Sequence, residues 1–120
     1  MNPVADASPA TVSAPTPLIA VITTVATEAD ADTLARGAVA ARLAACVQVE
    51  AIRSTYRWQG QVCQEPEQRL LFKTTAHQAP ALMQWLAAQH PYELPSIYTL
   101  PVADASPAYA AWVQAETGAA

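Results

Sequence analysis

The most regular pattern in the chain lies between Cys46 and Thr75, where β-branched and aromatic residues alternate with polar ones on both sides of Gln59-Gly60. Such alternation around a glycine-containing turn is typical of a β-hairpin. A two-residue turn also fixes which positions face each other across the two strands. The predicted pairs are Trp58 with Gln61, Val49 with Leu70, Val47 with Phe72, and Cys46 with Lys73.

The apolar positions of the first hairpin strand change parity partway along it. Val49 is at an odd position, whereas Tyr56 and Trp58 are at even positions. We interpret this change as a β-bulge near Ala51-Ile52, where one extra residue would turn the strand over. We also expect the second strand to be interrupted at Pro66, because proline has no N–H to donate to the ladder.

The length of the hairpin predicts an oligomer. Strands of about 14 residues reach about 46 Å at roughly 3.3 Å per residue, whereas a helix of about 16 residues spans about 24 Å. The helices of one chain therefore leave the outer half uncovered, including Tyr56, Trp58 and Val62. We expect another chain to bury these side chains. The alternative is a solvated, mobile hairpin arm.

Further regular elements are predicted on both sides of the hairpin. The apolar run Leu18–Val25 is typical of a central strand. Thr27 and Asp30 form a capping-box pattern that begins a helix, which should continue to about Ala45. The elements expected after the hairpin are a helix between Thr75 and Gln89, a strand between Pro95 and Pro101, and a last helix from Ser106-Pro107 to Gly118.

This order of elements predicts an α+β protein with the ferredoxin-like β-α-β-β-α-β architecture, followed by a C-terminal helix. Two helices should cover one face of a four-stranded antiparallel sheet and leave the other face open, which again favours an oligomer. We assign residues 18–117 to this domain. Residues 1–17 are interpreted as a disordered Pro/Ala/Ser/Thr tail and residues 118–120 as a C-terminal tail.

The composition of the chain excludes some classes of binding partner and indicates the cellular compartment. A net charge of −4 with six Lys and Arg argues against nucleic acid and anionic membrane surfaces. The chain shows neither a secretory signal nor an apolar run near the roughly 18 residues that span a bilayer. We therefore expect a soluble cytoplasmic protein, in which Cys46 and Cys63 are free thiols, because their hairpin rungs lie roughly 33 Å apart.

Catalytic motifs are missing from the sequence. It contains no nucleophile elbow, P-loop, H-E-x-x-H or glycine-rich phosphate loop, and only three glycines. We therefore expect no enzymatic activity and no required cofactor. The soft or borderline metal ligands are Cys46, Cys63, His77 and His90, and none forms a C-x-x-C or H-x-x-x-H pair. Weak copper binding through Cys46 or His90 stays open.

Two positions allow both a functional and a structural interpretation. Lys73 faces Cys46, where its ammonium would favour the thiolate; it either pairs with a carboxylate of another subunit or anchors an anionic ligand. His90–Glu93 follows a helix, whose dipole favours a protonated or donor imidazole at His90. This segment is either a rigid helix-to-strand turn or the rim of an inter-subunit pocket with Trp58, Tyr98 and Lys73.

Five segments, taken together, are similar to one known family. They are LAACVQV at 43–49, Y-x-W-x-G at 56–60, LLFKTT at 70–75, HPYELPSIYTLPV at 90–102 and YAAW at 109–112. In order and spacing, from residue 19 to about 116, they resemble the CutA family of divalent-cation tolerance proteins. This resemblance implies a cytosolic ferredoxin-like homotrimer similar to the PII signalling proteins, with hairpin strands that join subunits edge to edge.

The resemblance also implies a role in tolerance of copper and other heavy metals. The copper ligands proposed for bacterial members correspond here to Thr23, Gln89 and His90, so two of the three are replaced. The candidate metal residues are therefore His90 and Cys46, with Cu(II) or another divalent cation bound weakly. The candidate ligand-cleft residues are Trp58, Glu67, Lys73, Tyr92 and Tyr98.

We therefore expect a non-enzymatic trimer of divalent-metal (copper) tolerance or homeostasis, which binds a metal ion or a small ligand at clefts between subunits. One alternative is a PII-like sensor whose clefts bind an anion or metabolite, with metal effects secondary. The other is an interaction scaffold that uses only its projecting surfaces.

Overall fold

The computed structural model describes residues 17–119. The elements follow in the order β1 (Leu18–Val25), α1 (Glu28–Ala40), β2 (Cys46–Trp58), β3 (Gln61–Thr75), α2 (Ala79–Gln89), β4 (Ile97–Pro101) and α3 (Pro107–Ala115). The strands form one antiparallel sheet of order β2-β3-β1-β4. This arrangement confirms the predicted ferredoxin-like fold. Apart from Pro17, the predicted N-terminal tail lies outside the described residues, as does Ala120.

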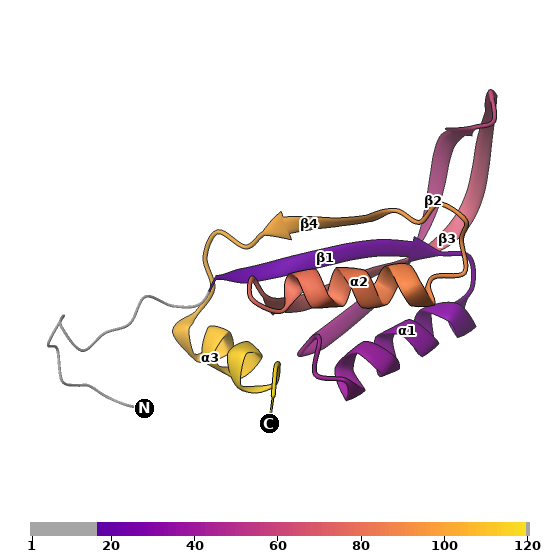
Figure 1. Ribbon diagram of the computed structural model, residues 1–120. Coiled ribbons are helices and arrows are strands. Elements are labelled where there is room, and N and C mark those ends of the chain that lie inside the picture. The colour runs from indigo at the N-terminus through magenta and orange to yellow at the C-terminus, as the bar shows by residue number, and fades with distance from the viewer. Residues whose placement is uncertain (1–16, 120) are drawn as a thin grey trace, which may run out of the picture.

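One face of the sheet is covered by α1 and α2, which lie side by side beneath β1 (Figure 1). The core between these helices and the sheet is apolar and closely packed. Its fully buried large side chains include Val21, Leu70, Phe72, Leu82 and Leu86. The opposite side of the sheet, which these two helices do not cover, is called the open face below.

Helix α1 begins as predicted and ends earlier. The Thr27 hydroxyl accepts a hydrogen bond from the Asp30 N–H at 3.1 Å, which caps the first turn. The helix stops before the predicted Ala45 because Arg42 adopts a positive φ of 60°. The N–H of Leu43 then turns back to the Ala38 carbonyl at 3.0 Å, which closes the helix end.

The hairpin register is the predicted one at all four positions, from Cys46 opposite Lys73 to Trp58 opposite Gln61. Gln59 and Gly60 both have positive φ, at 51° and 76°. This conformation is typical of a type I′ turn, whose twist matches that of the flanking strands. A two-residue turn therefore fixes the register over the whole length of the hairpin.

The predicted bulge and the predicted interruption at Pro66 are both wrong, because β2 and β3 pair without a break. In an unbulged strand, Val49 faces the helices, as its partner Leu70 does, whereas Trp58 faces the open side. The parity change thus marks a switch of the apolar face. Pro66 is tolerated because β1 pairs with β3 only from Gln68 onward, so that one edge of β3 is free at the proline.

The hairpin extends well beyond the helices and its tip projects from the body of the domain (Figure 1). The described chain measures 59 × 26 × 22 Å along its principal axes. At the tip, Val62 is 69% exposed, and Tyr56 and Trp58 are about two-fifths exposed. In a single chain these apolar side chains therefore lie at the surface, as the strand length predicts.

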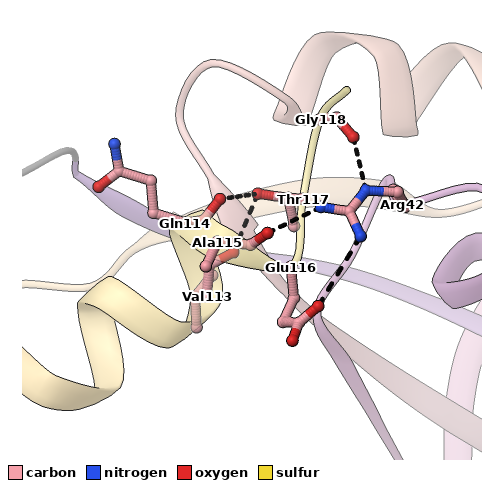
Figure 2. A network of polar contacts seen from close by, with 7 residues as sticks. All are labelled: Arg42, Val113, Gln114, Ala115, Glu116, Thr117 and Gly118. Atoms are coloured by element: carbon pink, nitrogen blue, oxygen red, sulfur yellow. Dashed lines mark hydrogen bonds and ion pairs between the residues drawn. The ribbon is translucent and has the colours of Figure 1, made fainter. Parts of the chain in front are cut away.

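The end of α3 is anchored by Arg42 (Figure 2). The guanidinium donates from Nε to the Gly118 carbonyl at 2.8 Å and from Nη2 to the Ala115 carbonyl at 2.7 Å. The Gly118 N–H donates in return to the Arg42 carbonyl at 2.9 Å. Arg42 thus joins the C-terminal end of α3 to the connection between α1 and β2.

Candidate functional site

The described chain contains a groove of about 840 Å³. Its walls come from the outer halves of β2 and β3, the end of β1, the connection between α2 and β4, and β4 itself. Strand alternation positions the aromatic side chains: Tyr56 and Trp58 share the open face, and Tyr98 joins them because it pairs with Ile22 on that face. The groove therefore lies on the open face.

The connection between α2 and β4 is fixed to the hairpin by one short hydrogen bond. The Tyr92 hydroxyl donates to Oε2 of Glu67 at 2.7 Å, and both residues are half-buried. Desolvation, followed by this carboxylate, raises the pKa of Tyr92, so the phenol stays protonated and remains a donor. This bond closes one side of the groove.

His90 is bonded at both ring nitrogens. Nδ1 accepts the N–H of Tyr92 at 3.1 Å, so the proton of a neutral ring is on Nε2. Nε2 lies 2.9 Å from the Thr23 hydroxyl and 3.0 Å from the Thr24 carbonyl, to which it donates. Desolvation lowers the pKa of His90, against smaller opposite contributions from Thr24, Asp30 and Glu67. The imidazole is thus a donor, as predicted, but its environment favours the neutral form, contrary to the predicted effect of the helix dipole.

The two candidate metal ligands lie apart within one chain. Cys46 is level with Lys73 and Ala20 in the sheet, at the base of the hairpin. His90 contacts Thr23 and Thr24, about three residues further along β1 and two strands away from β2. From strand dimensions, this separation is about 14 Å. These positions do not form a copper-binding set in one chain, and residues 17–119 hold no group of three or more His, Cys, Asp or Glu suited to a metal ion.

Four of the five predicted cleft residues do come together. Trp58, Glu67, Tyr92 and Tyr98 all line the groove. Lys73 does not; its ammonium lies 5.5 Å from the centre of the Tyr109 ring on α3, at the distance of a cation–π contact. The cysteines are free thiols in the structure, as predicted.

The groove also contains residues that the sequence analysis did not select as site residues. Tyr56 precedes Trp58 by two positions, and Glu65 precedes Glu67 by two positions, so each pair shares a strand face. The period of two could have identified them once the strand was accepted as unbulged. Glu93 comes from the irregular connection, where the sequence offers no such periodicity.

Among the helices in residues 17–119, none combines the length and the apolar character needed to cross a membrane.

Comparisons with known proteins agree on one family. The family model described as CutA1 divalent ion tolerance protein matches residues 19–116. The divalent-cation tolerance protein CutA of Thermus thermophilus is 44% identical over 99 residues, which covers 82% of this chain and 96% of that protein.

Solved structures give the same result. CutA from Synechococcus elongatus superposes with a TM-score of 0.83 at 47% identity, covering 86% of this chain and 92% of that chain. A second structure of the S. elongatus protein, complexed with a Bis-Tris molecule, superposes with a TM-score of 0.79 at 46% identity, covering 84% and 94%. The family match and these relatives show that the chain belongs to the CutA1 divalent ion tolerance protein family.

Proposed function

We propose that this protein is a non-enzymatic, cytoplasmic homotrimer that acts in tolerance of divalent cations, copper included. The observation that carries the proposal is the family match over residues 19–116. This match includes the hairpin, both helices that cover the sheet and nearly all of the described domain. The relatives named divalent-cation tolerance proteins align over 99 and 98 residues, which cover 82% and 81% of this chain.

The free edges of the sheet support assembly. Within residues 17–119, β2 and β4 are the outer strands, so each has one edge without a partner strand. β2 is 13 residues long and carries the exposed Tyr56 and Trp58. Unpaired edges of this length pair readily with other chains. We infer that the hairpin strands join copies edge to edge, and that a closed ring of three copies leaves no such edge exposed.

The surroundings of His90 support weak binding of metal. A metal ion needs a free lone pair on the imidazole, yet Nδ1 accepts the Tyr92 N–H and Nε2 donates to Thr24. A single imidazole completed by water is a weak site for a divalent ion. We therefore propose low-affinity or regulatory metal binding at clefts between subunits, rather than tight storage of copper.

The groove supports the proposal that the protein binds a small ligand in addition to a metal ion. Its volume of about 840 Å³ is within the range of small-molecule pockets. The related S. elongatus protein has been solved with a Bis-Tris molecule, which is a small organic compound. We propose that a small ligand in this groove participates in the metal response. The names of the relatives favour this function over a PII-like sensor that acts independently of metals.

Growth of cells that lack the protein tests the proposed function. These cells and the parent strain are grown on graded Cu(II), Zn(II) and Cd(II), with the chain restored from a plasmid as the control. We expect lower resistance to at least one cation and recovery on restoration. Native mass spectrometry of the purified protein then measures the subunit number and any retained metal or ligand. Unchanged growth on every cation contradicts a role in tolerance, and a monomer mass contradicts the trimer.

A further inference from the structure

The groove on the open face has a distinct chemical character. Its aromatic lining residues are Tyr56, Trp58, Tyr92 and Tyr98, and its carboxylates are Glu65 and Glu67, with Glu93 at the connection. The guanidinium of Arg69 also faces it, but Glu50 Oε1 accepts from Nε at 3.0 Å and from Nη2 at 2.7 Å. This ion pair offsets the positive charge of Arg69. The groove therefore combines aromatic faces with an excess of negative charge.

The tyrosines of the groove keep their aromatic faces and hydroxyl donors because the phenols stay neutral. Desolvation, followed by the Glu67 carboxylate, raises the pKa of Tyr92. Desolvation, followed by the Glu65 carboxylate, also raises the pKa of Tyr56. A neutral phenol presents a negative π face and donates through its hydroxyl. Although Glu67 already accepts one such bond from Tyr92, a carboxylate has room for further donors.

Aromatic faces beside carboxylates are the surroundings that alkylammonium ions prefer, because the ring quadrupole attracts the charge and the carboxylate neutralises it. We infer that this groove binds a small organic cation of the alkylammonium class. The inference rests on the proposed function, since it names the ligand class of the same groove. It also differs from the anionic ligand expected from the sequence, because Lys73, the proposed anchor of an anion, contacts Tyr109 outside the groove.

The test uses choline as the cationic probe and 3,3-dimethylbutan-1-ol, its uncharged analogue of the same shape, as the control. Calorimetry is performed on the full chain in an amine-free buffer with a metal chelator, and light scattering gives the assembly mass in the same buffer. We expect saturable choline binding that is at least about tenfold tighter than binding of the alcohol. Equal affinities, no choline binding, or a preference for inorganic phosphate overturns the inference.

Two substitutions assign the binding to the groove. Glu67→Gln removes the charge and keeps an oxygen that accepts from Tyr92, and Tyr98→Leu removes an exposed aromatic face. Each should weaken choline binding by about tenfold. Glu28→Gln and Trp112→Leu are the matched controls outside this groove and should bind choline like the unmodified chain. Unchanged affinity in both groove variants overturns the assignment.

Failure of this inference is separable from failure of the proposed function. Choline affinity is measured without metal, and metal resistance is measured in cells. If the chain binds choline through Glu67 but cells that lack the chain keep their metal resistance, the inference holds and the proposed function is contradicted. A chain required for resistance that does not bind choline overturns the inference alone.

Discussion

Tyr92 and Glu67, 25 residues apart in sequence, are joined by a hydrogen bond of 2.7 Å from the phenol to the carboxylate. Tyr92 lies in the connection between α2 and β4, and Glu67 lies on the hairpin strand β3. This hydrogen bond therefore joins an irregular segment of the groove wall to a regular one.

Tyr92→Phe removes this hydrogen bond and keeps the ring. A bond to a buried carboxylate contributes about 1.5–3 kcal/mol, and the partial exposure of this pair reduces the expected loss to about 1 kcal/mol. For a domain of this size, that loss lowers the melting temperature by about 4–8 °C. Calorimetric melting at neutral pH measures the change. Tyr109→Phe, on α3, is the matched control, and equal melting temperatures for the two variants contradict the prediction.

The lowered pKa of His90 predicts stability that falls in mild acid. The folded state disfavours the imidazolium, whereas the unfolded chain protonates near the ordinary value of about 6.5. Between these two pKa values the unfolded state binds more protons, so stability is full above about pH 6.5 and declines as the pH falls below it. Urea unfolding from pH 7.5 to 5, with a chelator present, measures this decline.

His90→Gln should reduce that pH dependence, because the titrating group is gone. His77→Gln is the matched control, since His77 is exposed, and should retain the decline of the unmodified chain. A pH profile that is the same with and without His90 contradicts the assigned cause.

Trp58→Ala tests assembly through the hairpin. If another copy buries Trp58, truncation costs about 3–5 kcal/mol per chain from lost contacts and the cavity that remains. The assembly should then dissociate at micromolar concentrations, as measured by light scattering. The control is Trp112→Ala, which truncates an exposed tryptophan on α3 and should leave the mass of the assembly unchanged. A monomer mass for the unmodified chain removes the basis of this prediction.

Copper binding should be weak and depend on His90. Binding to either ring nitrogen has to displace a hydrogen bond to Tyr92 or Thr24, and Thr23 and Gln89 replace the other ligands implied by the resemblance. We expect Cu(II) binding that His90→Ala reduces, and Cu(I) binding that depends on Cys46. Calorimetry measures both. Sub-micromolar Cu(II) affinity that survives His90→Ala contradicts this prediction.

Arg42 has a backbone in a strained conformation and a side chain that bonds to the end of α3. Two substitutions separate the contributions of the backbone and the side chain to stability. Arg42→Ala loses the bonds to Ala115 and Gly118 and should lower the free energy of unfolding by about 2 kcal/mol, since the guanidinium is one-third exposed. Arg42→Gly loses the same bonds, but glycine tolerates the positive φ of 60°, which recovers about 1 kcal/mol. Urea unfolding should therefore rank Gly above Ala. The reverse order contradicts a backbone contribution.

The hairpin register could be predicted because it depends on local chemistry. Once Gln59-Gly60 is recognised as a two-residue turn, every pair back to Cys46 and Lys73 follows from counting. The bulge could not be judged in this way. The apolar face changes between Val49 and Trp58 because the helices cover only the base of the hairpin, and the alternating pattern alone does not distinguish such a change of face from a bulge.

The candidate site was predictable where its residues lie on strands or belong to a shared motif. Trp58, Tyr92 and Tyr98 were identified and do line the groove. Within one chain, the register places Lys73 opposite Cys46 at the base of the hairpin, away from the groove, and its predicted place in a cleft between subunits stays a prediction. The early end of α1 was missed because a positive φ at Arg42 has no glycine or asparagine to signal it.

Since the apolar side of the hairpin switches midway, a newly synthesised chain has one hydrophobic surface that its own helices cover and another beyond their reach. The first is buried by intramolecular folding, at a rate independent of expression level. If the proposed trimer forms, the second surface is exposed until another copy binds, so the lifetime of the unassembled chain falls as protein concentration rises. Dilution during refolding should therefore favour loss to proteolysis at the hairpin tip, and high local synthesis, as on a polysome, should favour recovery of native protein.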